Sequence, residues 1–192
     1  MSLTFYYAPM STSTVTECVL AELGTPCERV KLDLKTDDTK QPAFRALNPN
    51  GSVPTIVHDG TAIWESAAIT MYLGETFGVD AKLYPAPGPQ RGEAMKWIVW
   101  ANATLVSPAY RLASSEAEKA HADVTARLEV LDGALAKRDY LLGDYSLADT
   151  HVFGFVAWIG MLGVDLKRFA NVSAWMQRCG GRPVIATILS GG

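Results

Sequence analysis

The chain has 192 residues, of which 48% are hydrophobic and 19% are charged, and its formal net charge is −3. A chain of this length buries roughly 70% of its unfolded surface, and the composition excludes an intrinsically disordered protein. The weak acidic charge argues against a nucleic-acid-binding surface, because such surfaces are usually strongly basic.

Strand and helix patterns alternate over the first 80 residues. Short apolar or alternating runs predict strands, and apolar residues at helical spacing predict helices. In chain order the predicted elements are a strand at 3–7, a helix at 15–23, a strand at 28–32, a loop at 35–41, a helix at 43–47, strands at 55–58 and 62–64, and a helix from residue 65. Gly24 is expected to end the first helix, and Asp59-Gly60 to form the turn between the last two strands.

The rest of the chain is predicted to be helical. Three prolines between positions 84 and 89 mark a domain boundary. The apolar stripes beyond it are Met95, Ile98 and Val99; Val124, Leu128, Leu131 and Leu135; Val152, Val156 and Ile159; Val172, Trp175 and Met176; and Ile185, Ile188 and Leu189. The third stripe belongs to a helix that is apolar nearly all round, so we expect that helix to be central. The predicted division is a domain at 1–80, a linker at 81–89 and a helical domain at 90–192.

Several motifs in this order resemble the glutathione S-transferase family, and the resemblance covers nearly the whole chain. They are Tyr6-Tyr7-Ala8-Pro9 followed by small hydroxylated residues, Asn48-Pro49-Asn50-Gly51-Ser52-Val53-Pro54-Thr55, Glu65-Ser66, Ser146-Leu147-Ala148-Asp149, and Trp175-Met176-Gln177-Arg178 with Arg182-Pro183. The resemblance implies the fold of that family, which is a thioredoxin-like α/β N-terminal domain followed by an all-α C-terminal domain.

The resemblance also implies that glutathione is the co-substrate. It implies a cis peptide bond between Val53 and Pro54, which would turn the backbone N–H and C=O of Val53 outward to pair with an extended peptide. A trans proline at the start of an edge strand is the alternative. Glu65 and Ser66 would hold the ammonium and the carboxylate of the γ-glutamyl group at the start of a helix. Without the family context, a helix cap is the alternative for this pair.

The hydroxyl groups at positions 11–14 are candidates for activating the glutathione sulfur. A hydroxyl that donates to the sulfur at the positive end of a helix favours the thiolate. The candidates are Ser11, then Thr12, then Ser13, and a simple helix cap is the alternative for the whole run. Tyr6 and Tyr7 are further candidates, although their place inside a strand favours core packing.

The sequence departs from the beta-type bacterial members of the family at two positions. Thr12 falls where those members keep a cysteine, and Val106 falls where they carry a histidine. Thiol-transfer chemistry is therefore not expected, whereas conjugation or binding of glutathione remains. The electrophile pocket is expected between the domains, and its candidate residues are Met10, Asn102, Val106, Tyr110 and Trp158.

Ser146 and Asp149 have the spacing of a reciprocal helix cap, with an acid three residues after the cap residue. We interpret this pair as part of folding and not of catalysis. His58, His121 and His151 lie far apart without ligand spacing, so no metal site is expected.

The cysteines and the apolar runs bear on the compartment. Cys18, Cys27 and Cys179 are an odd number at wide spacing, which fits a reducing compartment. The longest apolar run, 152–164, is shorter than the about 20 residues that cross a bilayer, and the first residues lack the pattern of a secretory signal. We therefore expect a cytoplasmic protein without membrane or nucleic-acid partners.

The predicted function is that of a homodimeric glutathione S-transferase. It would conjugate the glutathione thiolate to small hydrophobic electrophiles and so serve in detoxification. Two alternatives remain open at this point. One is another glutathione-dependent enzyme, such as an isomerase, a peroxidase or a reductive dehalogenase, because a fold does not determine a function. The other is a catalytically silent, transferase-like interaction protein.

Overall fold

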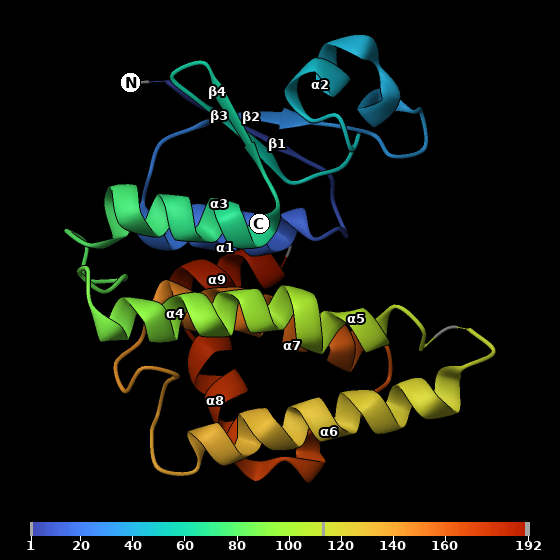
Figure 1. The fold of residues 1–192 in the computed structure, drawn as a ribbon, viewed down its shortest axis with the longest axis vertical. Helices are drawn as coiled ribbons and strands as arrows, with labels where there is room; N and C mark the ends of the chain where they lie inside the picture. The colour runs from blue at the N-terminus through green and yellow to red at the C-terminus, as the bar shows by residue number, and fades with distance from the viewer. Residues whose placement is uncertain (1, 113, 191–192) are drawn as a thin grey trace.

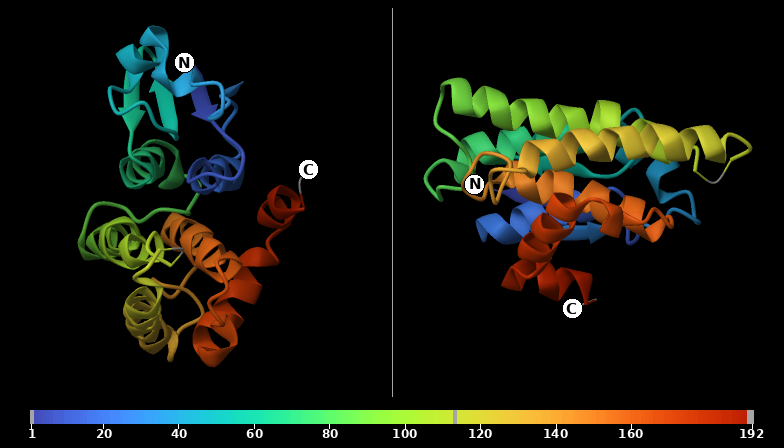
Figure 2. Two further views of the ribbon diagram at one scale, coloured as in Figure 1. Left: turned by 90° about the vertical axis from the view of Figure 1, so that its right-hand side faces the viewer. Right: turned by 90° about the horizontal axis from the view of Figure 1, so that it is seen from below.

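The computed structural model describes residues 2–112 and 114–190, and Figure 1 shows an α/β part stacked on a helical part. The elements of the first part are β1 (Leu3–Tyr7), α1 (Ser13–Leu23), β2 (Glu28–Lys31), α2 (Pro42–Leu47), β3 (Thr55–His58), β4 (Thr61–Trp64) and α3 (Ser66–Leu73). The strand order is β2-β1-β3-β4, with β1 and β2 parallel and the other pairs antiparallel. The helices α1 and α3 lie between the sheet and the helical part, and α2 covers the opposite face (Figures 1 and 2).

Local signals account for most of these boundaries. Gly24 ends α1 in the left-handed conformation, with φ of +60°, as its sequence position predicted. The segment 35–41 differs from the predicted loop, because it contains a short 3-10 helix, η1 (Asp38–Lys40). The carboxylate of Asp38 accepts the N–H of Asp33 at 2.9 Å and the hydroxyl of Thr36 at 2.9 Å. The polar composition of this segment predicted a loop, but these local hydrogen bonds give it a helical turn.

Every helix or strand named in the described residues of the second part is a helix, and isolated β-bridges occur only at 140–144. Its elements are α4 (Pro89–Trp100), the π-helical turn η3 (Ala101–Leu105), α5 (Val106–Ala109), α6 (Ala117–Leu135), α7 (Leu147–Met161), the 3-10 turn η4 (Leu166–Arg168), α8 (Ala170–Gly180) and α9 (Pro183–Leu189). A second π-helical turn, η2 (Gly74–Gly78), follows α3. Within residues 2–112 and 114–190, no helix is both long and apolar enough to cross a membrane.

The predicted central helix is α7. Val152, Val156 and Ile159 are fully buried, and α7 contacts helices from both parts of the molecule. Val99 departs from its predicted stripe, because its side chain is exposed and lines a cavity described below. Together the mixed sheet and the helical second part confirm the predicted fold class.

The reciprocal cap predicted at the start of α7 is present. The N–H and the hydroxyl of Ser146 donate to Asp149 Oδ2 at 3.0 and 3.1 Å. Asp149 Oδ1 accepts the N–H of Leu141 at 2.8 Å and the indole N–H of Trp175 at 2.9 Å. One buried carboxylate therefore joins the start of α7 to α8, which supports its interpretation as part of folding.

The two parts meet closely where α1 crosses α7. Gly154 of α7 faces Val15 of α1, and a Cβ atom at Gly154 would lie 2.7 Å from Val15 Cγ2. The small residue lets the two helices approach each other. This contact sets the first turn of α1 beside the helical part, where the candidate site lies.

Candidate functional site

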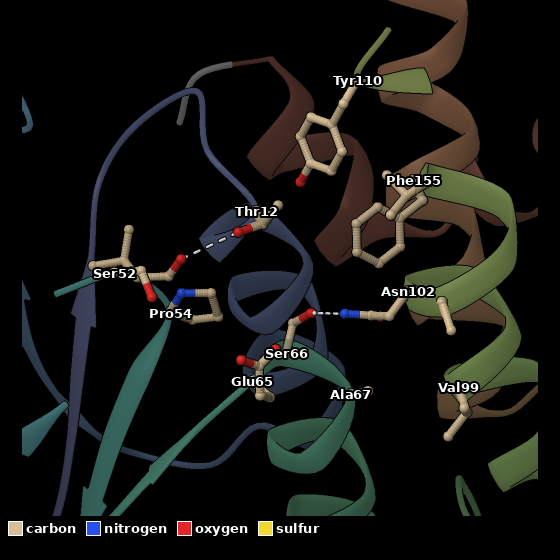
Figure 3. Close-up of a pocket in the computed structure, with 13 residues that line it drawn as sticks. Thr12, Ser52, Pro54, Glu65, Ser66, Ala67, Val99, Asn102, Tyr110 and Phe155 are labelled. Carbon is tan, nitrogen blue, oxygen red and sulfur yellow. Dashed lines mark hydrogen bonds between the residues drawn. The ribbon is translucent and has the colours of Figure 1, made fainter. Parts of the chain in front are cut away.

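A cavity of about 440 Å³ lies between the α/β part and the helical part (Figure 3). This volume is typical of small-molecule sites. The α/β part contributes Thr12 before α1, Ser52, Val53 and Pro54 before β3, and Glu65, Ser66 and Ala67 at the start of α3. The helical part contributes Val99, Asn102, Ala103, Val106, Tyr110 and Phe155.

The loop that carries Val53 is held by a buried asparagine. Asn48 Nδ2 donates to the carbonyl oxygen of Ser52 at 2.8 Å and to Thr55 Oγ1 at 3.0 Å. Gly51 has φ of +61°, and a Cβ atom there would lie 2.9 Å from the carbonyl oxygen of Thr39, so the turn requires glycine. The peptide bond between Val53 and Pro54 is cis. The motif at 48–55 thus folds as one unit and presents the Val53 backbone at the cavity.

The three hydroxyl groups before and at the start of α1 have different surroundings. Thr12 lines the cavity, and its Oγ1 donates to the carbonyl oxygen of Val53 at 3.1 Å (Figure 3). Ser13 is buried, donates to the carbonyl of Ala8 at 2.8 Å and accepts the N–H of Ala8 at 3.1 Å. Ser11 Oγ lies 2.8 Å from the same carbonyl and 2.6 Å from Ser13 Oγ. Ser11 and Ser13 hold the loop together, while the Thr12 hydroxyl lies on the cavity.

Glu65 and Ser66 lie where α3 begins. The Glu65 side chain is exposed and makes no capping hydrogen bond, so the capping alternative does not describe it. The backbone of Glu65 has φ of +71°, a strained value that in non-glycine residues is concentrated at functional sites. The first N–H groups of an α-helix have no partner within the helix, and they favour an anion at this point.

A series of hydrogen bonds connects Ser66 to the helical part. Asn102 Nδ2 donates to Ser66 Oγ at 2.9 Å, and His151 Nε2 lies 2.7 Å from Asn102 Oδ1. The other ring nitrogen of His151, Nδ1, lies 2.8 Å from Thr70 Oγ1. Burial lowers the pKa of the His151 imidazole to about 3. The ring is therefore neutral at physiological pH.

The far side of the cavity is apolar and partly aromatic. Phe155 of α7 and Val106 of α5 form its wall, and the exposed Tyr110 stands at its mouth. The ring of Tyr110 packs against Trp158, with 5.2 Å between the centroids. In Figure 3 the Tyr110 hydroxyl is on the side of the ring that faces Thr12.

The structure brings together most, but not all, of the residues singled out from the sequence. Eight of them line the cavity: Thr12, Val53, Pro54, Glu65, Ser66, Asn102, Val106 and Tyr110. Met10 does not line it, because the residue is 89% exposed to solvent, with a left-handed backbone at φ of +55°. Trp158 does not line it but packs against Tyr110, which does. Tyr6 packs on Phe44, and Tyr7 packs on Phe5.

Sequence reasoning missed Ser52, Ala67, Val99, Ala103 and Phe155 in the lining. Apolar residues at helical spacing usually belong to the core, so the sequence pattern did not indicate a cavity at Val99, Ala103 and Phe155. Positions 99, 102, 103, 106 and 110 share one helical face, and that spacing was the available signal. His151 lies behind this lining, and its signal in the sequence is a single histidine in a nearly apolar helix.

Comparisons with known proteins agree with this geometry. Residues 1–75 match the family model described as "Glutathione S-transferase, N-terminal domain", and residues 96–183 match "Glutathione S-transferase, C-terminal domain". A relative from Xanthomonas campestris pv. campestris, named glutathione S-transferase GST-4.5, is 30% identical over an alignment of 186 residues, and the match covers 90% of each chain.

Solved structures give the same picture. A glutathione transferase from Methylococcus capsulatus superimposes with a TM-score of 0.87 and 27% identity, covering 98% of both chains. A sphingomonad glutathione S-transferase complexed with glutathione superimposes with a TM-score of 0.86 and 26% identity, again covering 98% of both chains.

Proposed function

The chain belongs to the glutathione S-transferase family, and from that premise we propose that its cavity binds glutathione and conjugates it to small hydrophobic electrophiles. One observation carries the proposal. The Thr12 hydroxyl, the Val53 backbone and the Ser66 hydroxyl, which come from three separate segments, line one cavity that has an apolar far wall. A polar, extended thiol peptide fits the near side and an apolar electrophile fits the far side.

Glutathione would lie along the Val53 loop and the start of α3. Its cysteinyl N–H and C=O would pair with the Val53 backbone, as a short added strand. Its γ-glutamyl carboxylate would accept hydrogen bonds from Ser66 at the positive end of α3, and its ammonium group would face the Glu65 carboxylate. Val53, Pro54, Glu65 and Ser66 are also the residues for which the sequence predicted a role in binding glutathione.

Among the three hydroxyl groups, that of Thr12 is our first candidate for binding the glutathione sulfur. Ser11 and Ser13 are engaged with each other and with Ala8, so the order that we propose differs from the order expected from the sequence. The cysteinyl N–H of glutathione would compete for the Val53 carbonyl, and the Thr12 hydroxyl would then donate to the sulfur. A charge-assisted bond of this kind favours the thiolate, and one unit of pKa corresponds to about 1.36 kcal/mol.

The reaction then needs no nucleophile from the protein. The thiol proton passes to solvent, the thiolate forms a bond to the electrophilic carbon, and the leaving group departs with the electrons of its bond. Val106, Phe155 and Tyr110 would hold the apolar part of the electrophile. Holding two reactants in one cavity converts a bimolecular step into one within a complex.

We also propose a cytoplasmic homodimer with a role in detoxification. The strand β4 is at an edge of the sheet, and Trp64 at its end is exposed. Exposed edges and aromatic patches are features that a partner commonly covers. Cys18, Cys27 and Cys179 are free thiols, which fits a reducing compartment. Sedimentation at the mass of a single chain would contradict the dimer.

The matched pair Thr12→Val and Thr12→Ser tests the mechanism. Valine keeps the shape of threonine without the hydroxyl, while serine keeps the hydroxyl. With a chlorodinitroarene and glutathione, Thr12→Val is expected to lower kcat/KM about tenfold and to move its pH profile to higher pH by about one unit, and Thr12→Ser to retain most of the rate. An unchanged rate in Thr12→Val, with a large loss in Ser11→Ala, would return the role to Ser11.

Calorimetry with glutathione separates the remaining alternatives. Binding at millimolar concentration or tighter supports a glutathione-dependent protein, and conjugation of the chlorodinitroarene then distinguishes a transferase from an isomerase, a peroxidase or a dehalogenase. No binding would instead favour a catalytically silent, transferase-like protein.

A further inference from the structure

His151 is a buried polar residue that the proposed chemistry does not use. It lies in α7, next to the fully buried Val152, and it contacts no ligand directly in the proposed mode of binding. Its two ring nitrogens nevertheless both have polar partners, Thr70 in the α/β part and Asn102 in the helical part. When both ring nitrogens of a buried neutral histidine have partners, the donor or acceptor character of those partners determines which nitrogen carries the hydrogen.

The direction of the hydrogen bonds follows from the chemistry of Asn102. Its Nδ2 can only donate, and it donates to Ser66 Oγ. Its Oδ1 can only accept, so the hydrogen in the 2.7 Å contact must belong to His151 Nε2. A neutral imidazole with a hydrogen on Nε2 has a bare Nδ1, which accepts from the Thr70 hydroxyl. All three bonds therefore point the same way, from Thr70 through His151 and Asn102 to Ser66.

This direction decides what Ser66 can offer a ligand. Because Ser66 Oγ accepts from Asn102, its own hydrogen is not used in that bond. Among the described residues Ser66 Oγ makes no second hydrogen bond. With the opposite tautomer of His151 and a reversed Asn102 amide, Ser66 would donate to Asn102 and would present only lone pairs to the cavity. Lone pairs attract the ammonium group of a ligand and repel its carboxylate.

We propose that His151 is a positioning residue, which acts through Asn102 to keep the Ser66 hydroxyl a donor toward the carboxylate of the γ-glutamyl group. This inference rests on the proposed binding of glutathione. It assigns a function to a residue that lies one layer behind the cavity and joins the two parts of the molecule.

The tautomer of His151 in the unmodified protein is the first test. Nitrogen-15 chemical shifts of the ring, measured without ligand between pH 6 and 8, are expected to show a protonated Nε2 and a bare Nδ1. A protonated Nδ1, or a ring that titrates in this range, would overturn the inference. This measurement needs no substitution and no binding of glutathione, so it stands even if the proposed function fails.

The matched variants His151→Gln and His151→Met are the second test. Glutamine can donate to Asn102 from nearly the position of Nε2, whereas methionine has a similar size and no donor. Both variants remove the ring nitrogen that accepts from Thr70, so the loss of that hydrogen bond does not distinguish them. The Kd for glutathione is expected to be about tenfold weaker in His151→Met than in His151→Gln, the effect of losing a hydrogen bond to a charged group. Equal values of Kd would overturn the inference.

A glutathione analogue separates positioning from a general loosening of the site. In 4-aminobutanoyl-cysteinylglycine the carboxylate that Ser66 would bind is replaced by hydrogen. The two variants are expected to bind this analogue equally, because it has no group for the Ser66 hydrogen. If His151→Met weakens glutathione and the analogue by the same factor, His151 is only structural. If the unmodified protein does not bind glutathione, the proposed function fails instead.

Discussion

The carboxylate of Glu22 and the guanidinium of Arg182 form two hydrogen bonds, of 2.6 and 2.7 Å, although 160 residues separate them in the chain. Glu22 lies in α1, whose first turn follows Thr12, and Arg182 precedes α9. The hydroxyl of Tyr145 also donates to Glu22 at 3.0 Å, and the guanidinium lies 3.6 Å from the centre of the Tyr145 ring. The pair fixes the first helix of the α/β part to the last helix of the helical part.

Removal of Arg182 is expected to destabilise the fold strongly. The Glu22 side chain is only 3% exposed, so Arg182→Ala leaves a buried carboxylate without its cation and is expected to lower the free energy of unfolding by about 2–4 kcal/mol. Lys40→Ala is the matched control, because its ion pair with Asp37 is exposed, and it should cost under about 0.5 kcal/mol. Urea denaturation measures both; equal losses would contradict the importance of the Glu22 contact.

Substitution of Gly154 is expected to disturb the contact between α1 and α7. The added methyl group in Gly154→Ala would meet Val15 Cγ2 at 2.7 Å, and overpacking of this kind costs about 1–3 kcal/mol. Gly133 of α6 has open space where a Cβ would lie, so Gly133→Ala is expected to stabilise the protein by about 0.5–1 kcal/mol. Thermal unfolding of the two variants should therefore shift in opposite directions. A destabilised Gly133→Ala, or an unaffected Gly154→Ala, would count against this packing.

Tyr110 is expected to contribute to the binding of the electrophile and not of glutathione. An aromatic contact contributes about 0.5–1.5 kcal/mol beyond its buried area, so Tyr110→Ala should raise KM for an aromatic electrophile several-fold and leave the Kd for glutathione unchanged. Tyr110→Phe keeps the ring and should retain most of the effect.

Met10→Ala serves as the control for Tyr110, since Met10 is exposed and does not line the cavity. It is expected to leave both constants unchanged. A rise in KM for the electrophile in Met10→Ala, comparable with that in Tyr110→Ala, would restore Met10 to the pocket where its sequence position predicted it.

His151 is expected to make stability depend on pH below neutrality. In the folded protein burial lowers the pKa of His151 to about 3, whereas an unfolded histidine has a pKa of about 6.5. Between these values the unfolded state binds the extra proton, so stability falls as the pH falls. The stability advantage of the unmodified protein over His151→Gln should shrink by about 2 kcal/mol between pH 7.5 and pH 5.

Urea denaturation of both proteins at several pH values measures this change. Taking the difference between them removes the contribution of the other titrating groups, which the two proteins share. A difference that stays constant over the range would mean that the His151 ring gains its proton as readily in the folded state as in the unfolded state.

Local patterns made the architecture predictable. The strands, the helix end at Gly24 and the cap of Ser146 and Asp149 depend on residues close together in the chain, and each is present where the sequence predicted it. The exception at 35–41 is also local, because side-chain hydrogen bonds of Asp38 formed a helix that composition did not predict. The resemblance of the motifs to a known family added the cis peptide bond at Val53 and the residues expected around the cavity.

The individual roles within the site depended on contacts between distant segments. Ser11, Thr12 and Ser13 are nearly equivalent as a sequence, and what distinguishes them is that Thr12 meets Val53, 41 residues away, while the others turn to Ala8. His151 looked like an isolated polar residue until the fold set Thr70 and Asn102 on either side of it. Spacing along a chain determines which face of a helix or strand a residue occupies, but hydrogen bonds act only over about 3 Å. The hydrogen-bond partners of these site residues come within that distance only when the distant segments of the chain have packed together.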